Sequence, residues 1–406
     1  MKRRVDVLVA GAGISGLAAA LMLANTRHGG RLRVTLADAG EPPAAEANEP
    51  VDLRVSAIAA GSAAILVDAG AWQHLEPGRC GAFDRMRVWD AAANPDGPAT
   101  LRFDAAEFGV PHLGWIVENR LVRHALVRAL ASRDVTLRFG TSIATVDFTA
   151  DSPVVTFAGG EAASCDLLVL ADGGESRLRT AAGIDVDEWD YGQAAFVAHF
   201  ETTRPHGHTA WQRFLPDGPL GLLPLADGRV SVVWSTTPAH AAGLQACSDD
   251  ALGAALTEAS DGILGEFRAG GPRGSFRLVA RHARQYVGRG FALVGDAAHA
   301  VHPLAGQGAN LGIADAATLA GVVEAALARR EWPGDRPVLR RYERARRGEN
   351  AAMLRFVTGL NGLFASDSAL LGELRRTGMA LFNLSGPIRA TMAGVALGRA
   401  AGRPFP

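Results

Sequence analysis

Short apolar runs alternate with longer helix-forming stretches in the first and last parts of the chain. The apolar runs cover residues 5–10, 33–37, 165–171 and 291–295, and each is followed by a glycine or an aspartate. Runs of this length between turn residues are typical of strands that are buried on both faces. Residues 17–25 and 308–327 are rich in alanine and leucine and predict helices. The alternation predicts an α/β fold in which helices pack on a parallel sheet.

The middle of the chain has a different pattern. Gly228–Trp234 alternates polar and apolar residues, which predicts a half-buried strand in a second sheet. Several apolar side chains nearby are candidates for lining a substrate pocket, although such side chains more often form ordinary core. They are Trp211, Phe214, Leu222, Leu223 and Trp234.

The composition excludes several classes of protein. A chain of 406 residues with 48% apolar and 20% charged residues can bury a large core, so we expect a soluble globular protein of two packed domains. The net charge of -1 provides no overall basic character, and we expect no nucleic-acid partner. Lys2 is the only lysine among 41 basic residues. This excludes Walker-type NTPases, kinases and pyridoxal enzymes, which need an interior lysine.

The cysteines and histidines predict neither a disulfide framework nor a metal site. Cys80, Cys165 and Cys247 are far apart and form no CxxC motif, which suits a reducing cytoplasm. His299 and His302 lie close together in the sequence but have no companion ligands. We therefore expect a cytoplasmic protein without a bound metal.

The first apolar run leads into a glycine motif. Gly11, Gly13 and Gly16 follow in GxGxxG spacing between a predicted strand and a predicted helix. In this context the first glycine permits a tight turn, the second lets a diphosphate approach the backbone, and the third lets the helix pack on the strand. Asp38 follows the second run, where an acid can hydrogen-bond a ribose hydroxyl. The segment predicts a dinucleotide site for either NAD or FAD.

The third apolar run ends in the sequence DGGESRLR at residues 172–179. Asp-Gly at a strand end is also an ordinary turn, in which case Arg179 would lie on a solvated helix face. A strand followed by DGxxSxxR resembles the second fingerprint of the flavin-dependent aromatic hydroxylases. The resemblance implies that Asp172 and Gly173 lie near a flavin, and it favours FAD over NAD.

The fourth apolar run is followed by GDAAHAVHPLAGQGANLG at residues 295–312. At the carboxyl end of a parallel strand, Asp296 would point into the ligand crevice, where its carboxylate can accept hydrogen bonds from the ribityl hydroxyls of FAD. The backbone from Pro303 to Gly308 leads into a helix whose positive end would face the flavin ring. His302 is a candidate for proton transfer, although a histidine in a tight loop more often holds backbone geometry.

Four longer stretches extend the resemblance to one family. The sequence resembles the ubiquinone-biosynthesis flavin hydroxylases in DLRVSAIAAGS (52–62), LGWIVENRLVRHAL (113–126), WQRFLPDGPLGLLPLADGRVSVVWS (211–235) and LVGDAAHAVHPLAGQGANLG (293–312). The resemblance covers residue 5 to about residue 400. It implies the p-hydroxybenzoate-hydroxylase type of fold, with a Rossmann-like FAD-binding domain, an inserted β-sheet substrate domain and C-terminal helices.

That fold implies a division of the chain and a set of site residues. The FAD-binding domain would comprise residues 1–75, 113–185 and 276–340, the substrate domain 76–112 and 186–275, and a C-terminal helical segment 341–406. The FAD-binding residues would be Gly11, Gly13, Gly16, Asp38, Arg54, Arg120, Asp172, Gly173, Asp296, Gly306, Gly308, Ala309 and Asn310. The residues acting at the reacting ring would be His302, Pro303, Gly306 and Gln307. For Arg54 the alternative is a surface ion pair.

The resemblance also implies an activity. The protein would be an FAD-dependent monooxygenase that uses O₂ and NAD(P)H, through a flavin C4a-hydroperoxide, to hydroxylate a polyprenyl phenol or benzoquinol of ubiquinone biosynthesis. One alternative is a hydroxylase of a small soluble aromatic acid, which should have a polar pocket gated by arginine. The other is a flavin-binding scaffold that holds quinone-biosynthesis enzymes together without catalysis.

The end of the chain is basic and apolar. No acidic residue follows Glu373, while five arginines interrupt a helix-forming stretch: Arg375, Arg376, Arg389, Arg399 and Arg403. A basic amphipathic segment can lie on an anionic membrane surface, and the alternative is a helical cap with solvated arginines. A polyprenyl substrate favours the first, which would place a cytoplasmic protein at the periphery of the inner membrane.

Overall fold

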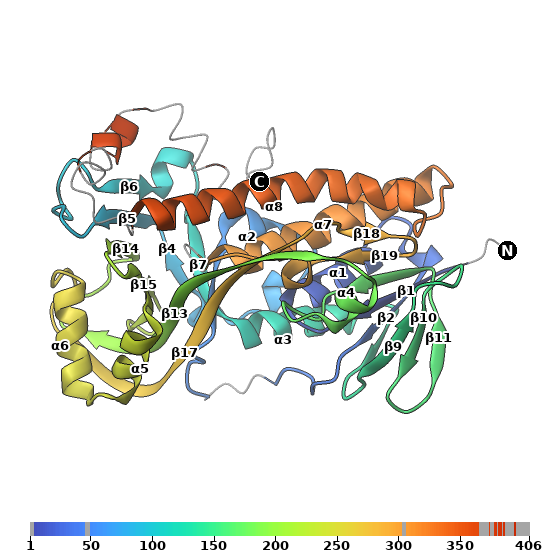
Figure 1. Ribbon diagram of the computed structural model, residues 1–406, viewed down its shortest axis with the longest axis horizontal. Helices are drawn as coiled ribbons and strands as arrows, with labels where there is room; N and C mark the ends of the chain where they lie inside the picture. Colours follow the sequence, from blue (N-terminus) through green and yellow to red (C-terminus); the bar gives the residue numbers. More distant parts are fainter. Residues whose placement is uncertain are drawn as a thin grey trace.

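Two large sheets and one long helix organise the molecule (Figure 1). The computed structural model describes residues 4–44, 49–302, 306–364, 373, 377–379, 381–383, 385 and 394. Helix α8 (Arg336–Phe364) runs along both sheets and contacts a strand of each. Helix α8 therefore links the two sheets.

The first sheet is the predicted parallel sheet. Its strand order is β18-β19-β12-β1-β2-β8, with an antiparallel pair at the β18 edge. The strands are β1 (Val5–Ala10), β2 (Leu32–Ala37), β8 (Val135–Arg138), β12 (Leu167–Leu170), β18 (Val287–Gly288) and β19 (Phe291–Leu293). Val7 of the central strand β1 lies opposite Leu167 on one side and Val34 on the other. Burial on both faces accounts for the uninterrupted apolar runs, and the predicted α/β class is confirmed.

Three helices pack on this sheet, and two of them approach each other closely. They are α1 (Ile14–Ala24), α3 (Asn119–Leu130) and α7 (Gln307–Ala328). Helix α1 begins earlier than predicted because Gly13 is its N-cap. A methyl group at Gly312 of α7 would lie 2.0 Å from the hydroxyl oxygen of Ser15 in α1. Only glycine at this crossing lets the two helices pack so closely.

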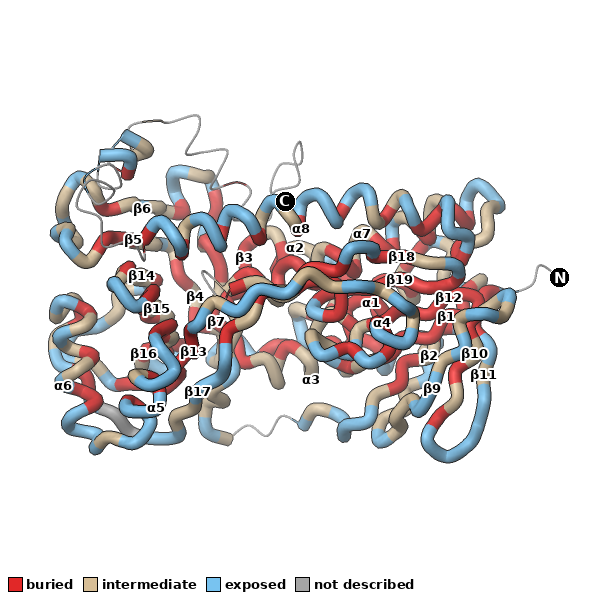
Figure 2. The backbone as a smooth tube through the Cα atoms, in the orientation of Figure 1, coloured by how far each residue is buried: buried red, intermediate tan, exposed pale blue. Residues whose placement is uncertain are grey.

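Helix α7 lies in the core. It is the one helix in the described part of the chain that is long and apolar enough to cross a membrane. Ile313, Leu319 and Val323 are nevertheless fully buried, and α7 packs against α1 and α8 (Figure 2). Its apolar character is that of a central helix in a globular protein.

The second sheet has eight strands in the order β20-β17-β13-β16-β15-β14-β5-β6. The strands are β5 (Arg85–Asp90), β6 (Leu101–Asp104), β13 (Val186–Thr202), β14 (Thr209–Leu215), β15 (Gly218–Pro224), β16 (Val230–Thr236), β17 (Phe267–Ala283) and β20 (His299–Ala300). Helices α5 (Pro238–Ala246) and α6 (Asp249–Ala259) cover one face. Strand β17 crosses the predicted boundary at residues 275 and 276, so the two predicted domains share a strand.

The apolar side chains that were candidates for a pocket lining do not share a face of this sheet. Trp211, Leu222 and Trp234 pack in or against the core formed with α5 and α6. Leu223 and Phe214 point the other way, where Phe214 stacks on Phe364 of α8 at a ring distance of 3.8 Å. Because side chains alternate along a strand, the five residues do not form one lining, and Trp211, Leu222 and Trp234 contribute to ordinary core.

Smaller elements complete the fold. One three-stranded sheet consists of β3 (Val55–Ala59), β7 (Gly114–Glu118) and β4 (Gly81–Phe83). Another consists of β11 (Ala162–Ser164), β10 (Val154–Phe157) and β9 (Ile143–Asp147). The other α-helices in residues 4–302 are α2 (Ala60–Asp68) and α4 (Arg177–Ala181). The same part of the chain has 3-10 turns at Gly29–Arg31, Trp72–His74, Pro77–Arg79, Ala105–Phe108 and Gly295–Ala297. The last turn carries Asp296.

We expect Gly312→Ala to lower the free energy of unfolding by about 1–3 kcal/mol, because the added methyl group would overlap Ser15. Combining it with Ser15→Gly removes the overlapping hydroxymethyl group and should recover a large part of that loss. Chemical denaturation of both single variants and the double variant measures the coupling. Strictly additive losses would contradict the close contact.

Candidate functional site

The three glycine- and aspartate-containing motifs meet at one edge of the parallel sheet. Gly11, Asp172 and Asp296 each follow within three residues of the last residue of a strand: β1, β12 and β19. These strands are neighbours, because Leu170 of β12 pairs with Ala10 on one side and Leu293 on the other. The carboxyl edge of a parallel sheet is where α/β proteins bind ligands.

The first glycine motif forms a turn with an open side. Gly11 has a φ of +110°, and a methyl group there would lie 2.3 Å from the carbonyl oxygen of Ala171. A methyl group at Gly16 would lie 2.0 Å from the oxygen of Gly11. Gly13 in contrast has no atom within 4 Å of such a position, and no side chain caps the helix that begins after it. Free N–H groups next to open space fit the diphosphate of a dinucleotide.

Asp38 lies beside the same turn. Its Oδ2 accepts a hydrogen bond of 2.6 Å from the N–H of Ala12, and its Oδ1 accepts one of 2.7 Å from the N–H of Gly40. Each carboxylate oxygen can accept a second hydrogen bond. The residue therefore holds the glycine turn and keeps acceptor capacity for a ribose hydroxyl.

The DGxxSxxR motif joins the other two motifs. Asp172 accepts hydrogen bonds of 2.5 Å from the Ser176 hydroxyl and 3.2 Å from the Leu178 N–H, so its carboxylate fixes its own loop. Arg179 is only 6% exposed, and its Nη1 donates to the carbonyl oxygens of Gly174 and Ala297. Arg179 on a solvated face is thereby excluded, and the second motif is tied to the turn that carries Asp296.

Gly173 and Asp296 both leave room for a ligand. No atom lies within 4 Å of a methyl position at Gly173, which has a φ of +93°. The Asp296 side chain is exposed and accepts no hydrogen bond from any described residue. The surrounding protein nevertheless desolvates it enough to raise its pKa. An exposed yet desolvated carboxylate stands in a recess, where hydroxyl groups of a ligand would supply the missing donors.

The start of α7 is a second uncapped helix end. Gly306 has a φ of +62° and lies against Ala57 of β3, while Gly308 faces open space. Ala309 is half-buried beside it. The side chain of Asn310 is occupied, because it donates to the oxygens of Ala57 and Gly306 and accepts from the N–H of Ala59. Asn310 thus anchors the helix start and leaves the backbone N–H groups for a ligand.

The remaining candidates from this part of the sequence are Gln307, Pro303 and His302. Gln307 is buried at 9% exposure. Pro303 lies outside the described residues. His302 is 1% exposed, and its Nε2 lies 3.2 Å from Oε1 of Gln193.

The hydrogen-bond network fixes the tautomer of His302. The amide nitrogen of Gln193 donates to the oxygen of Asp217 at 2.7 Å, so its Oε1 faces His302 and also accepts from Asn361. His302 therefore donates through Nε2, and Nδ1 is an acceptor that has no partner among the described residues. Burial lowers the pKa of His302 to about 4. The imidazole is neutral near pH 7 and cannot act there as an acid.

The arginines near the cofactor region divide into engaged and free groups. Arg120 donates to Glu118 and Pro50 and forms an ion pair with Glu49, so its charge is already balanced. Arg54 is exposed and has no ion pair within the described chain, which speaks against the surface-pair alternative. Of the two arginines implied by the resemblance, Arg120 is thus paired with acidic side chains and Arg54 is not paired within the described chain.

Sequence reasoning missed Arg123. Its Nε donates a 2.8 Å hydrogen bond to the oxygen of Ala12 in the glycine turn, and within the described chain its Nη groups have no partner. A free guanidinium beside an uncapped helix start suits a diphosphate. The signal in the sequence was its spacing from Arg120, since residues three apart lie on the same side of a helix.

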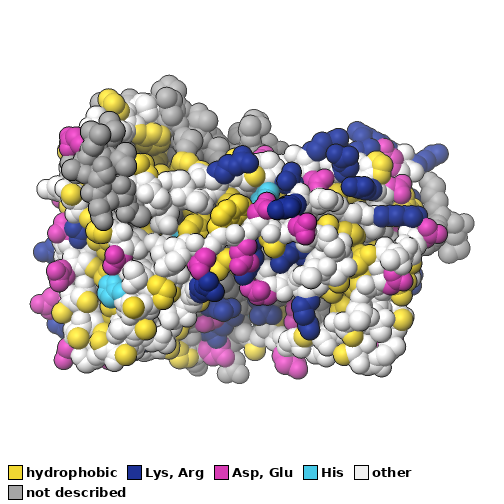
Figure 3. All heavy atoms as spheres, in the orientation of Figure 1, with side chains coloured by type: hydrophobic (Ala, Val, Ile, Leu, Met, Phe, Trp, Pro, Cys, Tyr) yellow, Lys and Arg dark blue, Asp and Glu magenta, His cyan; other side chains and the backbone are white. Residues whose placement is uncertain are grey.

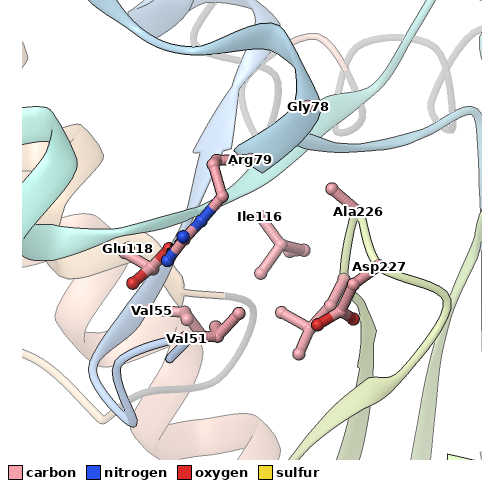
Figure 4. Close-up of a pocket in the computed structure, with 9 residues that line it drawn as sticks. Val51, Val55, Gly78, Arg79, Ile116, Glu118, Ala226 and Asp227 are labelled. Atoms are coloured by element: carbon pink, nitrogen blue, oxygen red, sulfur yellow. Dashed lines mark hydrogen bonds and ion pairs between the residues drawn. The ribbon is translucent and has the colours of Figure 1, made fainter. Parts of the chain in front are cut away.

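A small cavity beside β3 is too small for an aromatic ring (Figure 4). Val51 and Val55 line it together with the Arg79–Glu118 pair, whose side chains point toward each other at 2.9 Å. Its volume is about 20 Å³, room for about one water molecule. This cavity is therefore not a binding site for a molecule that contains an aromatic ring.

The face of the second sheet that is turned away from α5 and α6 is only partly covered. Gly221, Leu223 and Val233 are half-exposed there, although their neighbours on the other face are buried. Where strands β13 to β16 pair, this face carries no Asp, Glu, Lys or Arg side chain: Ala195, Val197, His199, Gln212, Phe214, Pro219, Gly221, Leu223, Ser231, Val233 and Ser235. Arg213 of β14 points the opposite way and bonds to Ala259 of α6. The face is apolar and adjoins Gln193 and His302.

Comparisons with known proteins agree with this geometry. Residues 4–357 match the family described as FAD binding domain. The chain is 37% identical over 371 residues to the 3-demethoxyubiquinol 3-hydroxylase of Escherichia coli, covering 91% of this chain and 92% of that protein. It is 34% identical over 429 residues to the human mitochondrial ubiquinone biosynthesis monooxygenase COQ6, covering 95% and 90%.

Solved structures show the same fold. Pseudomonas aeruginosa PqsL, in a mutant form, superimposes with a TM-score of 0.75 at 20% identity, covering 93% of this chain and 99% of that one. Klebsiella pneumoniae HpxO complexed with FAD has a TM-score of 0.73 at 20% identity, covering 98% and 100%. The predicted architecture is therefore confirmed at the level of fold.

We expect the burial of His302 to make stability fall in mild acid. The unfolded chain binds a proton at the ordinary histidine pKa near 6.5 and the folded chain only at about 4. This contribution to stability is complete above pH 6.5 and is lost as the pH falls toward 4, by about 2 kcal/mol between pH 7 and 5. Urea denaturation at both pH values should show a smaller acid loss for His302→Gln than for the unchanged protein. If both proteins lost the same stability between pH 7 and pH 5, the buried His302 would not be the cause of the acid loss.

Proposed function

We propose, because this chain belongs to the FAD-dependent hydroxylases of ubiquinone biosynthesis, that it adds an oxygen atom to the ring of a polyprenylated phenol or benzoquinol. The observation that carries the proposal is the uncharged face of the second sheet next to His302, on which Gly221, Leu223 and Val233 are only half-buried. An apolar ring with an isoprenoid tail can bury its surface there without leaving a charge unpaired. A small aromatic acid would need a cationic partner, and that face provides none where β13 to β16 pair.

Bound FAD would supply the oxygen-activating chemistry with electrons from NAD(P)H and with O₂. The chain would hold it through the groups that have free capacity. Asp38 would bind the ribose, Arg123 and the start of α1 the diphosphate, and Asp296 the ribityl hydroxyls. The open position at Gly308 would let the start of α7 face the flavin ring, where its positive dipole stabilises negative charge.

The remaining candidates receive narrower roles. Arg54 would approach the flavin as a free cation, and Gly173 would give the backbone room beside it. Neutral His302 would hold the loop through Gln193 and present Nδ1 as an acceptor. Water exclusion would come from the buried surroundings of this loop.

Cells that lack this protein should accumulate one under-hydroxylated polyprenyl intermediate. Returning the unchanged chain should clear it, whereas Asp296→Ala should lower hydroxylation at least ten-fold because the cofactor loses a principal anchor. Lipid extraction and mass spectrometry measure both. A normal quinone profile would refute the assignment and favour a soluble aromatic substrate. Rescue by a flavin-free Asp296→Ala protein would favour the scaffold.

We also propose that the protein docks on an anionic membrane surface through its C-terminal part. Most of residues 365–406, including all five arginines that suggested it, lie outside the described residues, but α8 shows the same character. Arg344, Arg347 and Arg355 are exposed without an acidic partner in the described chain. Basic side chains gather over the region of α8 (Figure 3). Phe356 and Leu363 are exposed beyond them. Basic and apolar groups on one helix suit an anionic interface.

Flotation with anionic and neutral vesicles tests this docking. We expect binding to anionic vesicles only, and a loss of at least five-fold when Arg344, Arg347 and Arg355 are all changed to glutamine. The matched control changes Arg128, Arg204 and Arg268, which removes the same charge elsewhere. Equal losses in both triple variants would show non-specific attraction instead of a defined surface.

A further inference from the structure

A buried carboxylate outside the proposed FAD contacts occupies a central place behind the site. Asp315 lies on the third turn of α7 and is fully buried. Its Oδ2 accepts from the N–H of Gly295 at 3.1 Å and from Nε2 of His299 at 2.6 Å. Its Oδ1 accepts from Nε of Arg346 at 2.7 Å and from Asn350 at 3.2 Å. All four acceptor positions of the carboxylate are filled.

These partners bracket the turn that carries Asp296. Gly295 precedes Asp296 and His299 follows it by three residues, so one carboxylate fixes both sides of the turn. Gly295 has a φ of +59° and packs against Ser15, which leaves the turn no alternative position on that side. The Asp296 carboxylate itself makes no hydrogen bond with described residues, so its direction is set by this backbone.

The charges within the network are balanced. Burial by itself raises the pKa of Asp315, but His299 and Arg346 outweigh it, and the net shift is downward. Asp315 is therefore ionised, and an ionised carboxylate can only accept hydrogen bonds. His299 must then carry its proton on Nε2. A buried carboxylate with four donors holds each donor in a defined position. The loss of any one donor would leave part of the negative charge of the carboxylate without a hydrogen bond.

Helix α8 supports this arrangement from the far side. Arg346 bonds to Glu349 and to Asn350, and Asn350 bonds to the hydroxyl of Tyr286. Further along the same helix, Asn361 donates to Gln193, which accepts from His302. Helix α8 thus reaches Gly295 through Asp315 and His302 through Gln193, in each case by way of one intervening side chain.

We propose that Asp315 is the positioning residue of the FAD site: it holds the Asp296 turn against α7 and α8 without touching the cofactor. The inference rests on the proposed contact between Asp296 and the ribityl chain. Asp315→Asn keeps the shape but presents an NH₂ group to at least one of its donors, so the turn loses one of its fixed ends. Affinity for FAD should fall, while most of the fold remains.

The experiment titrates FAD into apoprotein and follows the quenching of flavin fluorescence. We expect Asp315→Asn to raise the dissociation constant at least ten-fold. Tyr342→Phe is the matched control, because the Tyr342 hydroxyl is buried and joins α8 to Leu293 at 2.7 Å without contacting the turn. It should lower the thermal midpoint of the apoprotein but change FAD affinity by less than two-fold.

A second pair guards against a variant that fails to fold. Glutamine can place its amide N–H near the position of Nε2 of His299, whereas leucine cannot donate. His299→Gln should therefore retain FAD affinity within about three-fold, and His299→Leu should lose at least ten-fold. Unchanged affinity in Asp315→Asn, or equal losses in His299→Gln and His299→Leu, would overturn the proposal. Failure of the unchanged apoprotein to bind FAD would instead overturn the proposed function.

Discussion

The close crossing of α1 and α7 is the constraint on which the site depends. Ser15 fits against the backbone of Gly295 and Gly312, where methyl groups would lie 2.3 and 2.0 Å from its hydroxyl oxygen. Because side chains are absent at these two positions, the first glycine turn, the Asp296 turn and α7 converge at one edge of the sheet. Two uncapped helix starts then contribute free N–H groups and positive dipole ends to the same region.

Around this region the charged side chains fall into two groups. Arg120 and Asp172 are satisfied by protein partners and stabilise the walls of the site. Asp296, Arg54 and Arg123 retain unused hydrogen-bonding capacity. Since an unsatisfied polar group is costly when desolvated, the free groups identify where a polar ligand belongs. The distribution fits FAD, with an anionic diphosphate near Arg123 and hydroxyl groups near Asp296.

The second sheet provides an uncharged surface on the face that α5 and α6 do not cover. Helices α5 and α6 bury one face, and the opposite face is the proposed substrate surface. Helix α8 joins the two sheets, because Arg346 contacts Asp315 behind the flavin site and Phe364 stacks on Phe214 of the second sheet. Helix α8 therefore links the proposed cofactor site to the second sheet through Arg346 in its first half and Phe364 at its C-terminal end.

Local patterns in the amino-acid sequence predict the secondary-structure elements and the order of the motifs. Apolar runs specify β1, β2, β12 and β19, and Asp38 and Asp296 follow strands, because these signals depend on residues only a few positions apart. Only the tertiary structure decided which charges are free, since Arg120 meets Glu49 and Arg123 meets Ala12 across long stretches of chain. It also decided which sheet face is core, because alternation with a period of two is identical for both faces until α5 and α6 cover one.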